Sequence, residues 1–136
     1  MKTGSFIHFD HPSVAVHWED EDRIVLIQWK KAADSATFRA AMNAGFDLIT
    51  QKKGHRWLAD CVRMGPVAVE DTRWVTEEWT TRAITLGIKR IAFVMPQRAS
   101  ASISVIAFVT GPGGEKVPTM QFGDIGDARR WLREQR

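Results

Sequence analysis

The chain has 136 residues, of which 44% are hydrophobic and 26% charged, a composition typical of one globular domain and not of a disordered chain. Cys61 is the only cysteine, which excludes an intramolecular disulfide and a cysteine-rich zinc site. The formal net charge is +3, and four arginines lie among residues 129–136. We expect these arginines to complement the negative end of a C-terminal helix rather than to bind nucleic acid.

The sequence contains no segment expected to enter a membrane or to direct secretion. Its longest apolar runs, residues 24–27 and 91–95, are far shorter than the roughly 20 apolar residues that span a bilayer. Residues 1–7 are too few for the apolar stretch of a signal peptide. Together with the single cysteine, this predicts a soluble protein in the reducing cytoplasm.

The N-terminal half predicts a β-hairpin followed by a helix. Residues 14–18 alternate in polarity, residues 23–29 have an uninterrupted apolar centre, and the acidic turn 19–22 joins them. Asp34 and Ser35 can cap a helix that runs to about Lys53. Its inner face recurs at helical spacing and comprises Phe38, Ala41, Met42, Gly45, Leu48 and Ile49.

Strands and helices then alternate to the end of the chain. Short strands are predicted at residues 56–61, 89–96 and 117–122, the last at an edge of the sheet. Helices are predicted from about Glu70 to Leu86, at residues 100–109, and after Asp124. A turn is expected at residues 111–114, because they read Gly-Pro-Gly-Gly. The predicted order is ββαβαβαβα, an α/β fold with parallel inner strands in a single domain of residues 1–136.

Three carboxylates are candidates for a site. Asp60 follows an inner strand, at the sheet edge where ligands of α/β proteins bind, although it can equally accept hydrogen bonds from the next loop. Glu70 and Asp71 are neighbours in the first turn of a helix, where the dipole favours carboxylates. Because neighbours on a helix point about 100° apart, they are not expected to form a general acid–base pair.

Metal and nucleophile chemistry is not expected. His8, Asp10 and His11 are residue types that bind metals, but no supporting helical motif accompanies them, so we expect surface or loop histidines and no metal. Cys61 ends a strand without any signature of a catalytic base and is expected to be buried. We therefore predict no cofactor and no catalytic residues.

The aromatic composition is unusual, with six tryptophans and no tyrosine. Trp57, Trp79 and Trp131 fit core positions. Trp74 lies beside the inner face of its helix, and Trp18 ends a strand. Since tryptophan is enriched at binding hot spots, Trp74 and Trp18 are candidate partner contacts.

Residues 57–96 resemble a known family. The resemblance rests on Asp60 after a strand, Glu70-Asp71 with Trp74 and Trp79 on the next helix, and Gly87 before the following strand. These features are similar to bacterial STAS-like proteins of the SpoIIAA-like superfamily, which is also described as STAS/CRAL-TRIO-type. The resemblance implies a mixed sheet of four or five strands with helices packed on it.

The resemblance also implies where a regulatory hydroxyl would lie. Anti-sigma antagonists of this superfamily carry a phosphorylated hydroxyl at the start of the helix after the third strand, where this chain has Thr72 preceded by Glu70 and Asp71. Two carboxylates would repel a phosphate, so we do not expect that switch. Nearer relatives have Ser-Pro where this chain has Ala68-Val69, so the helix should lack a side-chain cap.

The leading hypothesis is a non-enzymatic binding or regulatory module that contacts, through Trp74 or Trp18, either another protein or a second copy of itself in a homodimer. The alternative is a carrier of a small molecule or lipid, with an apolar pocket near Trp79, Phe93 and Phe108. An enzyme that uses Asp60, Glu70 or Asp71 ranks third, and nucleic-acid binding is not expected.

Overall fold

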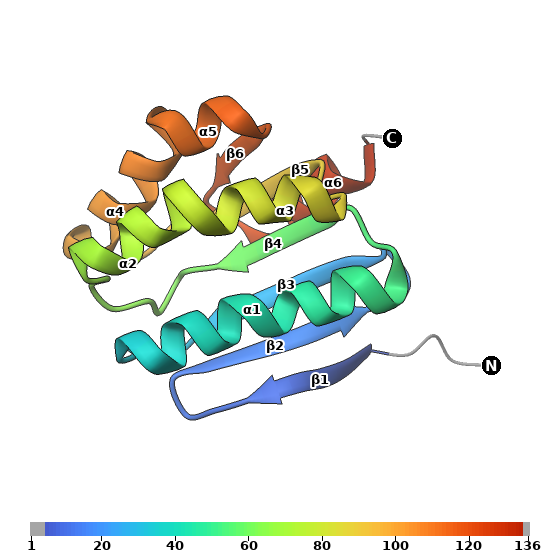
Figure 1. The fold of residues 1–136 in the computed structure, drawn as a ribbon, viewed down its shortest axis with the longest axis horizontal. Helices are drawn as coiled ribbons and strands as arrows, with labels where there is room; N and C mark the ends of the chain where they lie inside the picture. Colours follow the sequence, from blue (N-terminus) through green and yellow to red (C-terminus); the bar gives the residue numbers. More distant parts are fainter. Residues whose placement is uncertain (1–4, 135–136) are drawn as a thin grey trace.

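The computed structural model describes residues 5–134, which form a mixed sheet with helices on both faces (Figure 1). Six strands of the described chain lie in the spatial order β1-β2-β3-β4-β5-β6. Their bounds are β1 Ser5–Asp10, β2 Val14–Glu19, β3 Ile24–Trp29, β4 Arg56–Asp60, β5 Arg90–Val94 and β6 Thr119–Phe122. The helices are α1 Ser35–Lys52, α2 Val69–Trp74, η1 Val75–Trp79, α3 Thr80–Leu86, α4 Ala99–Thr110, α5 Pro112–Lys116 and α6 Ile125–Glu134.

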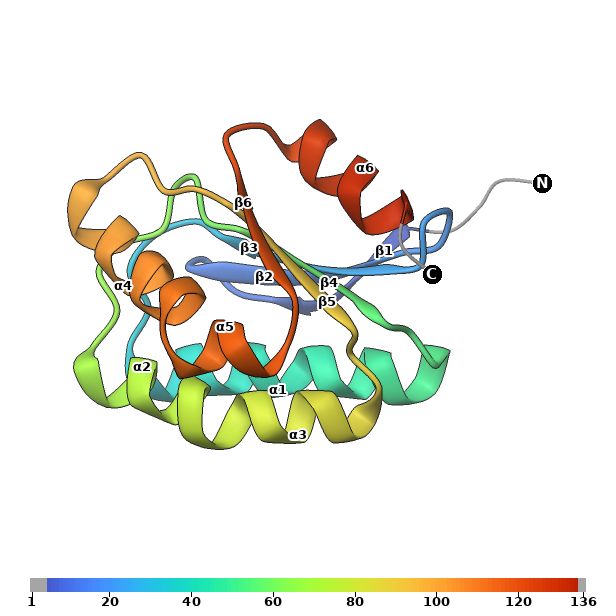
Figure 2. The same cartoon turned by 90° about the horizontal axis from the view of Figure 1, so that it is seen from above.

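Strand direction changes once across the sheet. β1, β2 and β3 form an antiparallel meander, whereas β3, β4, β5 and β6 run parallel. The three crossovers between parallel strands place α1, the α2–η1–α3 helix and α4–α5 on one face, and α6 covers the other (Figure 2). The predicted hairpin, parallel inner strands and α/β class are confirmed.

Two local predictions are corrected. The sheet has six strands instead of four or five, because Ser5–Asp10, where no strand is predicted, pairs with β2 as an edge strand. A register shift between Ile7 and Phe9 interrupts its alternation, which hides the strand from a pattern of period two. Residues 111–114 were expected as a turn, but the short helix α5 begins at Pro112, a residue suited to a first helical turn.

The helix predicted between Glu70 and Leu86 is continuous but contains one π-helical turn. In η1 the chain takes the wider turn, and the Thr80 hydroxyl donates a hydrogen bond to the Val75 carbonyl (2.7 Å). The extra residue per turn lets both Trp79 and Thr80 be buried. The helix start has no side-chain cap at Ala68, as the sequence predicts.

The larger core lies between the sheet and α1 and η1. The Trp57 ring of β4 meets Trp79 edge-on at 4.8 Å between ring centroids, and Phe46 of α1 stacks on Trp79 at 5.0 Å. A Cβ atom at Gly45 would lie 2.1 Å from Cη2 of Trp57. Because that contact is impossible, only glycine at position 45 lets α1 approach the Trp57 ring closely.

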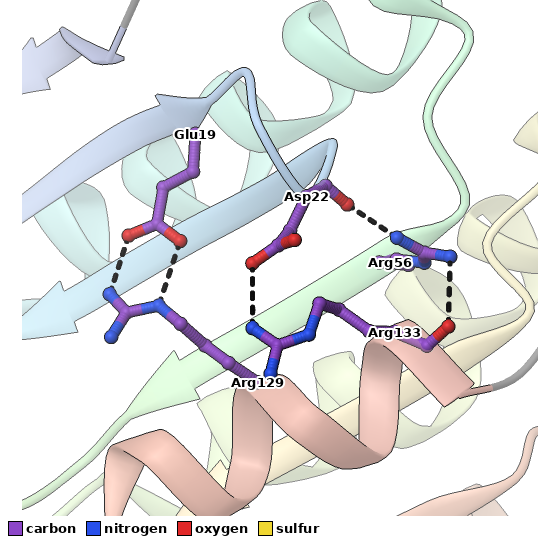
Figure 3. Close-up of polar contacts among 5 residues, drawn as sticks. All are labelled: Glu19, Asp22, Arg56, Arg129 and Arg133. Carbon is purple, nitrogen blue, oxygen red and sulfur yellow. Dashed lines mark hydrogen bonds and ion pairs between the residues drawn. The ribbon is translucent and has the colours of Figure 1, made fainter. Parts of the chain in front are cut away.

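Helix α6 is joined to the opposite face by apolar and charged contacts. Leu132 and Ala128 are fully buried against Leu26, Leu58, Ala92 and other residues of the sheet. Arg129 binds both carboxylate oxygens of Glu19, at 3.0 and 2.6 Å, and Arg133 pairs with Asp22 (3.2 Å) (Figure 3). Hydrogen bonding to Glu19 raises the pKa of Arg129 above its ordinary value. Two of the terminal arginines therefore join α6 to the acidic turn between β2 and β3.

We expect Trp79→Ala to lower the free energy of unfolding by about 3–5 kcal/mol, because it empties a packed aromatic site. The substitution also removes the hydrogen bond from the indole nitrogen to the Met42 carbonyl (3.2 Å). Urea denaturation followed by circular dichroism measures the change. The exposed neighbour Glu78→Ala is the control, with an expected change within about 0.5 kcal/mol. A loss below about 1 kcal/mol for Trp79→Ala would contradict its core position.

We also expect the apolar face of α6 to contribute more stability than its ion pairs. Leu132→Ala should cost about 2–5 kcal/mol. Arg129→Ala should cost less than about 1 kcal/mol, because the Arg129 and Glu19 side chains retain 30% and 17% of their exposure and water screens the pair. Equal losses in the same denaturation assay would overturn this ranking.

Candidate functional site

An apolar cavity lies between the face of β3, β4 and β5 and the helices α1, α2–η1 and α4. Its volume is about 70 Å³. At roughly 10–15 Å³ per water-sized sphere, it accommodates about five to seven of them. The lining consists of Ile27, Trp29, Phe38, Met42, Trp57, Ala59, Cys61, Met64, Val67, Thr72, Val75, Trp79, Ile91, Phe93, Ser104, Val105 and Phe108.

The floor of the cavity follows from a small residue in the central parallel strand. In the register of the sheet, Ala59 lies between Ile27 of β3 and Phe93 of β5. Side chains of these three positions point to the same face of the sheet. Because the alanine side chain is a single methyl group, space remains between its two larger neighbours.

Paired aromatic rings form the walls. Trp29 stacks on Phe38 with ring centroids 4.9 Å apart and an interplanar angle of 20°. Phe93 and Phe108 meet edge-on at 5.7 Å. These pairs come from different elements, so the cavity is bounded by contacts that also hold α1 and α4 on the sheet.

Few polar groups reach the cavity. Thr72 and Ser104 supply hydroxyls, and the Thr72 hydroxyl donates to the Ala68 carbonyl (3.3 Å). Burial, and secondly the negative charge of Asp60, raises the pKa of the Cys61 thiol. A thiol that stays protonated is a weak nucleophile, so Cys61 acts as an apolar wall residue.

Asp71 forms a buried polar junction close to the cavity. Its carboxylate accepts hydrogen bonds from the Ser35 hydroxyl (2.7 Å) and from Nε of Arg39 (3.0 Å). The Arg39 guanidinium also lies 5.1 Å from the ring centroid of Trp74. These contacts tie the start of α2 to the start of α1.

The other carboxylate candidates are separate from this junction. Glu70 is exposed beside Asp71, so the two carboxylates diverge, as their helical spacing predicts. Asp60 accepts a hydrogen bond from the Val62 backbone N–H (3.2 Å), which is the loop contact that the sequence offers as its alternative. Asp60 is not among the residues that line the cavity.

The two tryptophans expected as contacts differ in position. Trp18 is buried, with 1% of its surface exposed, and this corrects the expectation of an exposed contact. Its ring packs beside Gly54 at the end of α1, its indole nitrogen donates to Asp20 (3.1 Å), and Arg23 lies over it. Trp74 is half-buried and meets Phe38 edge-on at 6.4 Å.

The histidine-rich segment makes separate local contacts. His8 lies 3.4 Å from the Asp47 carboxylate, Asp10 pairs with Lys30 at 3.7 Å, and His11 accepts a hydrogen bond from the Ser13 N–H. Within residues 5–134, no three histidine, cysteine or acidic side chains gather closely enough to hold a metal ion.

Sequence reasoning named Trp79, Phe93 and Phe108 as neighbours of a pocket, and all three line the cavity. It missed Ala59, Met64 and Val67. The available signal was the small Ala59 in a strand flanked by strands of larger residues.

Comparison of the chain with protein-family models, with curated proteins and with solved structures found no match. Among the described residues, no helix has the length and apolar character needed to cross a bilayer.

We expect Arg39→Ala to lower the free energy of unfolding by about 1–3 kcal/mol, because it leaves the buried Asp71 carboxylate without its cation. The expected loss of stability is smaller than for a fully buried ion pair, because 40% of the Arg39 side chain is exposed. Arg73→Ala, an exposed position on α2, is the matched control and should change stability by less than about 0.5 kcal/mol. Equal effects of the two variants in thermal denaturation would contradict a structural role for the junction.

Proposed function

We propose that this chain is a non-enzymatic binding protein that holds a small apolar ligand between its sheet and the helices α1, η1 and α4. The observation that carries the proposal is the apolar cavity over β3, β4 and β5, which reaches Cys61, Met64 and Val67 beyond the carboxyl end of β4. Ligand pockets are concave and mostly apolar, and in α/β proteins they lie near the carboxyl ends of the strands.

The positions of the tryptophans favour this function over contact with a protein partner. Trp18 is buried, and Trp29, Trp57 and Trp79 line the cavity. Half of the six tryptophans are thereby used to build the cavity, and they no longer argue for an exposed binding surface.

We further propose a STAS-like frame for the sheet and a cytoplasmic location. An antiparallel hairpin followed by repeated helix–strand crossovers, together with the resemblance of residues 57–96, supports the frame. The free thiol of Cys61 supports a reducing compartment. In this frame Thr72 lines the cavity, and we do not propose it as a phosphorylation site.

Titration with 1-octanol tests the proposed function. Binding should be saturable and should change the tryptophan fluorescence, because three tryptophans line the cavity. At about 0.8 kcal/mol per buried methylene, five to seven methylenes contribute about 4–6 kcal/mol before the entropy cost of association, so the tightest expected Kd is about 0.05 mM.

A pair of phenylalanine substitutions on α4 locates the binding. Val105→Phe should weaken octanol binding at least tenfold, because Val105 lines the cavity and the added ring occupies it. Ile103→Phe, on the exposed side of the same helix, should leave binding unchanged. No saturable binding to the unsubstituted chain, or equal binding to both variants, would reject the proposal.

Self-association is a second candidate function, favoured by the outer side of α4. Ile103 and Ile106 retain 69% and 45% of their exposure, although isoleucine is among the residues most often buried. They are one helical turn apart and so form a stripe on the helix surface. If two copies pair through this stripe, the unsubstituted chain should be a dimer in light scattering, and the double variant Ile103→Ser/Ile106→Ser should be a monomer. An unsubstituted chain that is already monomeric would reject this candidate.

A further inference from the structure

A hollow lined by basic residues lies at the carboxyl edge of the parallel strands β3, β4 and β5. Its volume is about 220 Å³, and it is lined by Lys30, Lys31, Ala32, Val62, Arg63, Gly65, Gln97 and Arg98. The four cations come from the segments that follow β3, β4 and β5. No carboxylate is among the lining residues, so the hollow carries a concentrated positive charge.

Three of these cations have charged groups available for a ligand. Lys30 pairs with Asp10 at 3.7 Å. Within the described part of the chain, the side chains of Lys31, Arg63 and Arg98 make no ion pair or hydrogen bond. Helix α4 starts directly after Arg98, so the positive end of its dipole lies at the same edge.

The segments that carry the cations are fixed against one another. The backbone N–H of Lys30 donates to the Ser13 carbonyl (2.8 Å), and that of Gln97 donates to the Val62 carbonyl (3.1 Å). Gly65 packs directly on Ala32, since a Cβ atom at position 65 would lie 2.8 Å from the Ala32 backbone. The base of the hollow is therefore formed before any ligand binds, which lowers the entropy cost of binding.

A narrow hollow lies next to both the basic hollow and the apolar cavity, since it shares lining residues with each. It shares Trp29, Phe38, Met64 and Val67 with the cavity, and Lys31, Ala32 and Gly65 with the basic hollow. Its volume is about 10 Å³, roughly the space that one water molecule needs. The three spaces thus lie in a row from an apolar interior to a basic rim, separated by shared wall residues.

We infer that the ligand is an anionic amphiphile, a carboxylate with an unbranched alkyl chain of about six to eight carbons. This inference rests on the proposed function and adds the class of ligand. The alkyl chain fills the apolar cavity and passes the narrow hollow, and the carboxylate is bound by Lys31, Arg63 and Arg98. Guanidinium groups suit this role because they bind carboxylates through two parallel hydrogen bonds.

One negative charge of the protein faces this row of spaces. Asp71 lines the narrow hollow, but its carboxylate is occupied by Arg39 and Ser35. The alkyl chain, and not the carboxylate, would pass this point. The arrangement therefore selects the orientation with the anionic end outward.

A comparison of octanoate with neutral 1-octanol tests the inference. The triple variant Lys31→Gln/Arg63→Gln/Arg98→Gln should weaken octanoate binding at least tenfold and octanol binding less than twofold. Raising the salt concentration from 0.05 to 0.5 M should likewise weaken only octanoate binding. The control Arg73→Gln/Arg82→Gln/Lys89→Gln removes the same charge from exposed positions outside the three hollows and should change neither affinity.

The outcomes separate the two proposals. If octanol binds but octanoate binding is unaffected by the triple variant, the anionic ligand is rejected and the apolar cavity stands. If acetate binds as tightly as octanoate, the basic hollow takes a free anion, and the amphiphile is again rejected. If neither octanol nor octanoate binds, the proposed function falls, and the inference falls with it.

Discussion

The close packing of the Trp57 ring against α1 at Gly45 is the contact on which the rest of the structure depends. Trp57 lies on the central parallel strand, and its ring touches Phe46 of α1 and Trp79 of η1. This one side chain therefore sets how closely two helices approach the sheet. Because these large rings fix the helix axes, the smaller residues nearby cannot move close enough to fill the space between helices and sheet. The cavity is therefore a consequence of the packing.

The two faces of the sheet are covered in physically different ways. Toward α1 and η1, large aromatic rings pack over a long interface and leave a void above Ala59. Toward α6, a short helix buries only a few aliphatic side chains, and Arg129 and Arg133 join it to the acidic turn between β2 and β3. Arg129 and Arg133 are thereby used in the fold, whereas Lys31, Arg63 and Arg98, which follow the parallel strands, make no ion pair within the described residues.

The sequence predicted most of the secondary structure because hydrophobic periodicity reports burial. The hairpin, the helix that starts after Asp34 and the parallel strands were all readable in this way. The missed strand β1 is an edge strand with a register shift, and the π-helical turn at η1 lies inside a helix that otherwise keeps its period. The register shift belongs to the pairing with β2, and the π-helical turn accompanies the burial of Trp79 and Thr80; a local pattern contains neither.

For the site, the sequence by itself determined the chemistry of the residues, and the tertiary structure decided which of them meet. Trp79, Phe93 and Phe108 were readable as apolar neighbours of one pocket. The burial of Trp18 and the gathering of Lys31, Arg63 and Arg98 around one hollow were not. The reason is that these positions are distant along the chain, and only the parallel alignment of the strands brings the segments that follow them to a common edge.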